Sequence, residues 1–142
     1  MIKAYFDGAC EPKNPGGVAT WGIVVFNKEN IIHKDYGLAC KPYTPRSTNN
    51  YAEYTALIKV LGYCIKNNLL NIKVFGDSQL VIRQMTGIYA VKSPNIIPLY
   101  NEAKRLEKQL NSIEFQWIRR EFNEIADEMS KKAYVDFRLL GG

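Results

Sequence analysis

The sequence predicts an α/β fold in which a five-stranded mixed sheet is flanked by helices. Five short segments are rich in aliphatic and aromatic residues, as strands are. The first three follow one another through short polar connections, which is typical of an antiparallel meander. Helical stripes of apolar residues separate the later segments, which is typical of parallel strands. The five predicted strands are residues 2–6, 19–27, 31–39, 71–76 and 113–118.

The first segment, residues 2–6, ends on Asp7, and Gly8 follows at once. An unpaired carboxylate is costly to bury, so a charge at the end of an apolar strand needs a reason. One interpretation is a turn, because Asp-Gly is a strong hairpin signal. The other is a metal-binding or catalytic carboxylate at the end of a central strand. This stretch alone leaves both interpretations open.

A helix is predicted after the polar loop 41–49, with Thr48 or Asn49 as its cap. Its apolar residues recur at helical spacing, at Ala52, Ala56, Leu57, Val60, Leu61 and Cys64. Glu53 shares this stripe, and a glutamate is seldom buried unless it is paired or binds a metal. A position near the helix start, favoured by the macrodipole, would also explain it.

The strand 71–76 is also followed by an aspartate, Asp77. Ser78 can then cap a short helix that stops at Gly87. The two predicted helices after this strand return the chain to the end of the sheet at which strand 71–76 begins. The next strand can then run parallel to it.

Pro98 suits the first turn of a longer helix that runs to about Leu110. The last strand, 113–118, alternates apolar and polar residues. Asn123 can cap a final helix, which carries Asp127 near its start.

The direction of the chain through these elements predicts where the carboxylates lie. The first strand, the third strand, strand 71–76 and the last strand all run in the same direction. The first helix follows the third strand and the last helix follows the last strand, so both helices begin at the carboxyl ends of these strands. Right-handed crossovers place the helices on the faces of the sheet. Four carboxylates should then meet at one edge, which is where open α/β sheets bind ligands: Asp7, Glu53, Asp77 and Asp127.

Four clustered carboxylates without His or Cys favour a hard cation, Mg²⁺ or Mn²⁺, over Zn²⁺. Without a metal they would repel one another, and some would take up protons. Two such ions about 4 Å apart suit phosphodiester hydrolysis. The chain as a whole carries a net charge of +5, from 19 basic and 14 acidic residues, which modestly favours a polyanionic partner.

Length and composition point to one domain over residues 1–142 and to a cytoplasmic protein. The sequence is 46% hydrophobic and 23% charged, as ordinary globular proteins are. It has no apolar run long enough for a membrane span, and Lys3 and Asp7 interrupt any signal peptide. The cysteines, odd in number and without CxxC spacing, argue against a disulfide framework or a zinc site: Cys10, Cys40 and Cys64.

Four blocks of the sequence resemble the active-site blocks of type 1 ribonuclease H, especially the compact archaeal form. They are FDGAC at the N-terminus, STNNYAEY around Glu53, GDSQLV around Asp77 and NEIADEMS around Asp127. The resemblance implies a ribonuclease H-like fold and an endoribonuclease that cuts the RNA strand of RNA/DNA hybrids. It also implies 5′-phosphate and 3′-hydroxyl products. No membrane association is expected from the sequence, and no obligate protein partner is evident in it.

The same resemblance implies a role for each carboxylate and a set of substrate-binding residues. Asp7 would bridge two Mg²⁺ or Mn²⁺ ions, Glu53 and Asp77 would hold the ion on the leaving-group side, and Asp127 the ion beside the attacking water. The RNA 2′-hydroxyls, which distinguish RNA from DNA, would be read by Gly8, Cys10, Asn14, Asn49, Asn50 and Gln79. A phosphate of the DNA strand would be held by Arg46, Thr48 and Asn95.

The sequence departs from many bacterial members, which carry a histidine in the loop before the last aspartate. Residues 119–122 contain none, and the only histidine, His33, is expected on the third strand as a structural or surface residue. Two other functions remain open: a hybrid-binding module without catalysis, and a DNA-directed nuclease or transposase core on the same fold. A dinucleotide-binding enzyme is excluded, because no G-x-G-x-x-G follows a strand.

Overall fold

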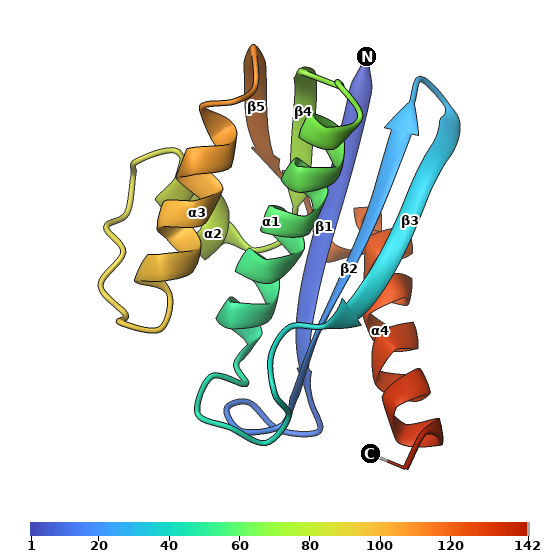
Figure 1. Cartoon of the computed structure of the whole chain (residues 1–142), viewed down its shortest axis with the longest axis vertical. Coiled ribbons are helices and arrows are strands. Elements are labelled where there is room, and N and C mark those ends of the chain that lie inside the picture. Colours follow the sequence, from blue (N-terminus) through green and yellow to red (C-terminus); the bar gives the residue numbers. More distant parts are fainter. Residues whose placement is uncertain (142) are drawn as a thin grey trace.

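A five-stranded mixed sheet runs through the centre of the computed structural model, which describes residues 1–141 (Figure 1). The strand order is β3-β2-β1-β4-β5. The first three strands pair antiparallel, whereas β4 pairs parallel with both β1 and β5. The strands are β1 Ile2–Glu11, β2 Val18–Asn27, β3 Asn30–Leu38, β4 Asn71–Gly76 and β5 Ser112–Trp117. The predicted fold class is confirmed.

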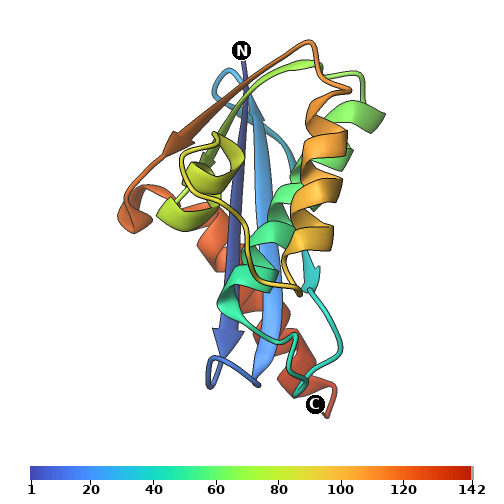
Figure 2. The same cartoon turned by 90° about the vertical axis from the view of Figure 1, so that its left-hand side faces the viewer.

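Helices cover both faces of this sheet. Figure 1 shows α1 and α3 in front of the sheet and α4 behind β2 and β3. Figure 2 shows the long loop that joins the short helix α2 to α3. The helices are α1 Asn49–Lys66, α2 Gln79–Met85, α3 Ile97–Glu107 and α4 Glu124–Leu139, with a 3₁₀ turn, η1, at Arg120–Phe122.

The main core lies between α1 and the sheet, because the apolar stripe of this helix faces alternate residues of β1, β2 and β4. All six apolar positions predicted for the stripe of α1 are buried. Helix α4 packs on the opposite face, where it closely approaches Gly22 of β2. A β-carbon at Gly22 would lie 2.3 Å from the carbonyl oxygen of Ala126, so only glycine allows this contact.

The first strand is longer than predicted, and this changes the position of Asp7. The strand continues to Glu11, so Asp7 lies within it and pairs with Gly22 of β2. The prediction that the strand ends at Asp7 was therefore wrong. Asp-Gly is no turn here because β1 and β2 stay paired as far as Glu11 and Val18.

Three further details differ from the prediction. Glu53 is the fifth residue of α1, so it lies in the second turn, beyond the reach of the helix-start explanation. Helix α3 ends at Glu107, short of Leu110. The side chain of Asn123 precedes α4 but makes no capping hydrogen bond.

The three cysteines are free, as the sequence predicted. Among residues 1–141, none of the helices combines the length and apolarity that crossing a membrane requires.

Candidate active site

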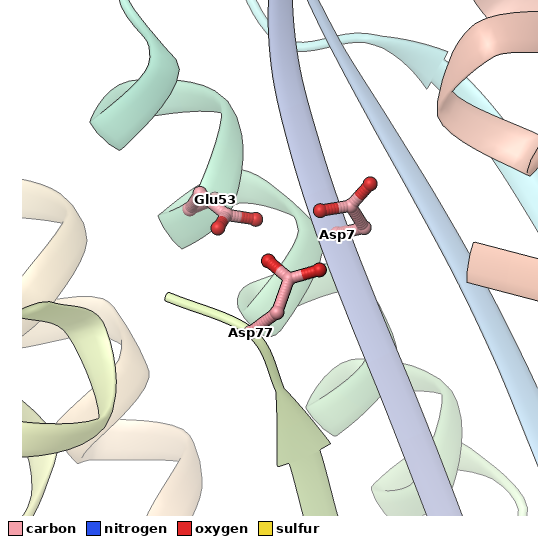
Figure 3. Close-up of side chains that lie close together, drawn as sticks. All are labelled: Asp7, Glu53 and Asp77. Atoms are coloured by element: carbon pink, nitrogen blue, oxygen red, sulfur yellow. The ribbon is translucent and has the colours of Figure 1, made fainter. Parts of the chain in front are cut away.

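Three carboxylates from three different elements point toward one another (Figure 3). Asp7 comes from β1, Glu53 from α1, and Asp77 from the residue directly after β4. Each offers an oxygen, and these oxygens all lie within 4.8 Å of one another. Asp7 and Glu53 are only 5% and 2% exposed. Strand β1, helix α1 and the end of β4 therefore bring three carboxyl groups to one point, and two of them are buried.

Gly8 brings α1 close enough to β1 for this cluster to form. A β-carbon at Gly8 would lie 2.3 Å from the backbone nitrogen of Glu53 and 2.4 Å from the carbonyl carbon of Ala52. With glycine there, the Gly8 N–H donates a hydrogen bond to the Glu53 carboxylate. The Asp-Gly pair is thus a packing requirement of the site, and the hairpin interpretation is wrong.

Two polar side chains that were not predicted as site residues contact the aspartates. The Asn123 amide donates to the Phe6 carbonyl oxygen at 2.9 Å and to Asp77 at 3.3 Å. The Ser130 hydroxyl lies 3.3 Å from an oxygen of Asp7. Both are buried polar residues. Ser130 follows Asp127 by three residues and so shares its helix face, which is the signal that could have identified it.

Asp127 completes the group of four, in a different environment. It lines the same pocket as the other three carboxylates. Its two oxygens pair with cations: Oδ2 lies 2.9 Å from Lys131 Nζ, and Oδ1 lies 3.7 Å from Arg120 Nη2. The structure thus brings together all four carboxylates that the sequence placed at one edge.

Burial and mutual repulsion raise the pKa values of the cluster. Burial raises the pKa of Asp7 to about 8, and the charges of Asp77 and Asp127 add to this effect. Burial, together with the charges of Asp7 and Asp77, raises the pKa of Glu53 well above its ordinary value. Burial also raises the pKa of Asp77, although a hydrogen bond from Asn123 opposes the shift. Without a counter-charge, the protein resists full ionisation of its own cluster.

The cluster fits a divalent cation. Its donors are carboxylate oxygens alone, which are the ligands preferred by Mg²⁺ and Mn²⁺. A bound dication would supply the missing positive charge and favour the ionised form of each carboxylate.

The predicted readers of the RNA strand are divided between this pocket and its surroundings. Gly8, Cys10 and Asn49 line the carboxylate pocket. Asn14 lies beside it, and its side-chain oxygen accepts the backbone N–H of Asn49 at 3.0 Å. The other two readers are outside the pocket lining: Asn50 is half-buried at the start of α1, and Gln79 is exposed at the start of α2.

Cys10 lines the carboxylate pocket, and its thiol contacts backbone oxygens of the protein. Its sulfur lies 3.2 Å from the carbonyl oxygens of both Lys13 and Ser47, to which it can donate. Burial raises the pKa of this thiol. Cys10 therefore fastens the loop after β1 to the loop before α1.

A second pocket contains two of the three residues predicted to hold a DNA phosphate. Arg46 and Asn95 line it together with Cys40 and Lys41. Thr48 is outside this lining, and its hydroxyl caps α1 by accepting the backbone N–H of Tyr51 at 3.1 Å.

His33 lies away from the carboxylates. It is on β3, and its ring stacks on Tyr63 of α1 at 3.9 Å between ring centroids. It lines a different pocket, between β3 and α1. The predicted place of His33 on the third strand is confirmed.

Comparison with known proteins agrees with this geometry. A family model described as reverse transcriptase-like matches residues 5–133. The bifunctional protein Rv2228c of Mycobacterium tuberculosis is 36% identical over 120 residues, which are 84% of this chain and 32% of that protein. The chain thus spans about a third of the length of this curated relative.

Two solved structures are similar along nearly their whole length. The RNase H1 of Halobacterium salinarum NRC-1 has 31% identity and a TM-score of 0.84, covering 95% of this chain and 98% of that one. LC11-RNase H1, solved in complex with an RNA/DNA hybrid, has 31% identity and a TM-score of 0.83, covering 98% and 99%. With the carboxylate cluster and the family match, these likenesses show that the chain belongs to the type 1 ribonuclease H family.

Proposed function

We propose that this chain is an endoribonuclease that hydrolyses the RNA strand of RNA/DNA hybrids and leaves 5′-phosphate and 3′-hydroxyl ends. The observation that carries the proposal is the pocket lined by four carboxylates from four parts of the chain. The hybrid-bound neighbour LC11-RNase H1 supports the choice of substrate. We take residues 1–142 to act as a single catalytic domain in the cytoplasm.

The four carboxylates would hold two Mg²⁺ or Mn²⁺ ions when substrate is bound. Asp7 would contribute to both ions, Glu53 and Asp77 to the one on the leaving-group side, and Asp127 to the one beside the attacking water. Ions held in this way lower the pKa of water and stabilise the leaving oxygen. Asn123 and Ser130 would keep Asp77 and Asp7 in position, because each contacts one of these carboxylates.

Ribose would be recognised by the polar groups beside the carboxylates. Asn49, Cys10 and the backbone of Gly8 line the pocket where the cut strand would lie. Arg46 and Asn95 line the second pocket, where an arginine suits a phosphate of the DNA strand. Each 2′-hydroxyl contact that a deoxy strand cannot make would leave a desolvated group, at a cost of about 1–3 kcal/mol.

The test is cleavage of four matched duplexes with Mg²⁺: RNA/DNA hybrid, DNA/DNA, RNA/RNA, and DNA with one embedded ribonucleotide. We expect fastest cleavage of the hybrid, none of DNA/DNA, and slow or no cleavage of RNA/RNA. The single ribonucleotide should be a poor substrate, because one 2′-hydroxyl cannot satisfy several readers. Equal cleavage of DNA/DNA and hybrid would indicate a DNA-directed nuclease, and binding without cleavage would indicate a hybrid-binding module.

A further inference from the structure

Asp127 differs from the other three carboxylates in already having cationic partners. Lys131 lies one helical turn further along α4 and reaches Oδ2 at 2.9 Å. Arg120, in the 3₁₀ turn before α4, lies 3.7 Å from Oδ1. Each oxygen of this carboxylate therefore faces a positive charge supplied by the protein.

The other three carboxylates have only neutral donors. Within residues 1–141, none of them lies within 4.0 Å of a Lys or Arg nitrogen. Glu53 accepts from the backbone of Gly8, and Asp77 accepts from the amide of Asn123. The pocket is thus divided into three carboxylates without a Lys or Arg nitrogen in contact and a fourth carboxylate that has two such contacts.

We propose that Lys131, assisted by Arg120, is a resident counter-ion that competes with metal for Asp127, so that two ions bind in a fixed order. The first ion enters among Asp7, Glu53 and Asp77, and the second binds only when the Lys131 ammonium leaves Asp127. This inference rests on the metal-dependent function proposed above. The competition would also control how fully the second metal site is occupied. The second ion would need a higher metal concentration to bind than it would need if Lys131 were absent.

The energetics allow such an exchange. The Lys131 side chain is 65% exposed, so its ammonium can move into water at little cost. The Asp127 side chain is only 17% exposed, so its charge remains costly without a partner, and an ion can take over that role. An ammonium a few ångströms from a dication also repels it appreciably, even in water. Removal of the Lys131 charge should therefore tighten the second ion by about threefold to tenfold.

The experiment counts bound Mn²⁺ by electron paramagnetic resonance in the metal-free protein titrated with Mn²⁺ alone, and it needs no enzyme activity. Wild type should show one tighter and one weaker ion. Lys131→Gln should tighten the weaker ion by about threefold to tenfold and leave the tighter ion unchanged. Arg120→Gln should act in the same direction by less, because its nitrogen is farther from Asp127.

Lys132→Gln is the matched control. It removes the same charge from the next residue, whose Nζ lies 5.5 Å from the centre of the Tyr36 ring. Its isotherm should coincide with that of wild type. If Lys132→Gln and Lys131→Gln tightened binding of the weaker Mn²⁺ ion equally, the cause would be the net charge of the protein. That result would overturn the proposal.

Two further variants separate failure of this proposal from failure of the proposed function. Asp127→Asn should lose the weaker ion and keep the tighter one, whereas Asp7→Asn should impair both. If Asp7→Asn impairs binding but Lys131→Gln binds like wild type, the competition is overturned and the metal site stands. If wild type binds no Mn²⁺ at all, both proposals are overturned.

Discussion

The backbone N–H of Gly8 donates a hydrogen bond to the carboxylate of Glu53, across a contact between β1 and α1 that no side chain could enter. We therefore expect Gly8→Ala to push α1 away from the strand, because the added carbon would meet backbone atoms at 2.3 and 2.4 Å. Cleavage should be lost, and unfolding free energy should fall by about 1–3 kcal/mol, as overpacking usually costs. Chemical denaturation and a hybrid cleavage assay measure the two effects.

Gly62 provides a matched control on the same helix. A β-carbon there would meet nothing within 4 Å. Gly62→Ala should keep full activity and raise the unfolding free energy by up to about 1 kcal/mol, since alanine favours a helix over glycine. Wild-type activity in Gly8→Ala would contradict the close packing on which the site depends.

Asp7→Asn should abolish cleavage with Mg²⁺ while the protein folds and still binds hybrid. The change removes a proposed metal ligand from the centre of the cluster. It also removes a buried carboxyl group whose ionisation is opposed by burial and by the charges of Asp77 and Asp127. Without metal, the melting temperature should therefore stay level or rise by a few degrees. Activity near that of wild type at saturating Mg²⁺ would contradict the assigned role of Asp7.

Stability without metal should depend on pH through the same residue. The pKa of Asp7 is about 8 in the folded protein, against about 3.9 in an unfolded chain, so the folded state holds a proton that the unfolded state releases. The raised pKa of Asp7 therefore adds to the free energy of unfolding. This contribution is complete below about pH 4 and is lost as pH rises through about 8. Denaturant titrations with a chelator should show unfolding free energy falling over this range, and Asp7→Asn should flatten the decline.

Some site residues are positioned by the local sequence, and these could be predicted. Others are positioned by packing between distant segments, and these could not. Asp77 follows its strand as predicted, because an apolar run and a helix cap mark both sides of it. The position of Asp7 was missed because strand pairing continued past an Asp-Gly signal. The role of Gly8 depends on how closely α1 approaches, which no local pattern reports.

The residues that support the carboxylates were harder to predict for a related reason. Asn123 occupies a helix-cap position, yet its amide donates to Phe6, more than a hundred residues earlier in the chain. A sequence pattern indicates the hydrogen bonds that such a side chain can make to nearby residues. It does not indicate a hydrogen bond to a residue far away in the chain. Thr48 is the opposite case, because its local capping bond forms as expected while the phosphate pocket is lined without it.

His33→Ala should leave the turnover rate unchanged. The ring stacks on Tyr63 and lines a pocket other than that of the carboxylates. Loss of the stacking should cost about 0.5–1.5 kcal/mol of unfolding free energy. The pH–rate profile of both proteins should lack a step near pH 6.5, the ordinary pKa of histidine. A large loss of rate with the fold intact would mean that His33 takes part in catalysis after all.

Variants of Asn49 and Asn14 can separate recognition of the substrate from stabilisation of the start of α1. Asn49 lines the carboxylate pocket, and its backbone N–H donates a hydrogen bond to the side-chain oxygen of Asn14. Asn49→Ala keeps that backbone bond and removes only the side chain. We expect hybrid cleavage to fall about tenfold in kcat/KM with an unchanged melting temperature, since one lost polar contact costs about 1–3 kcal/mol.

Asn14→Ala removes the acceptor that anchors the start of α1, so its melting temperature should fall together with its activity. Inhibition of hybrid cleavage by DNA/DNA should be the same for wild type and Asn49→Ala, because a deoxy strand has no 2′-hydroxyl for Asn49 to read. Equal weakening toward hybrid and DNA/DNA would show instead that Asn49 contacts the phosphate backbone. Full activity in Asn49→Ala would remove it from the substrate-binding residues.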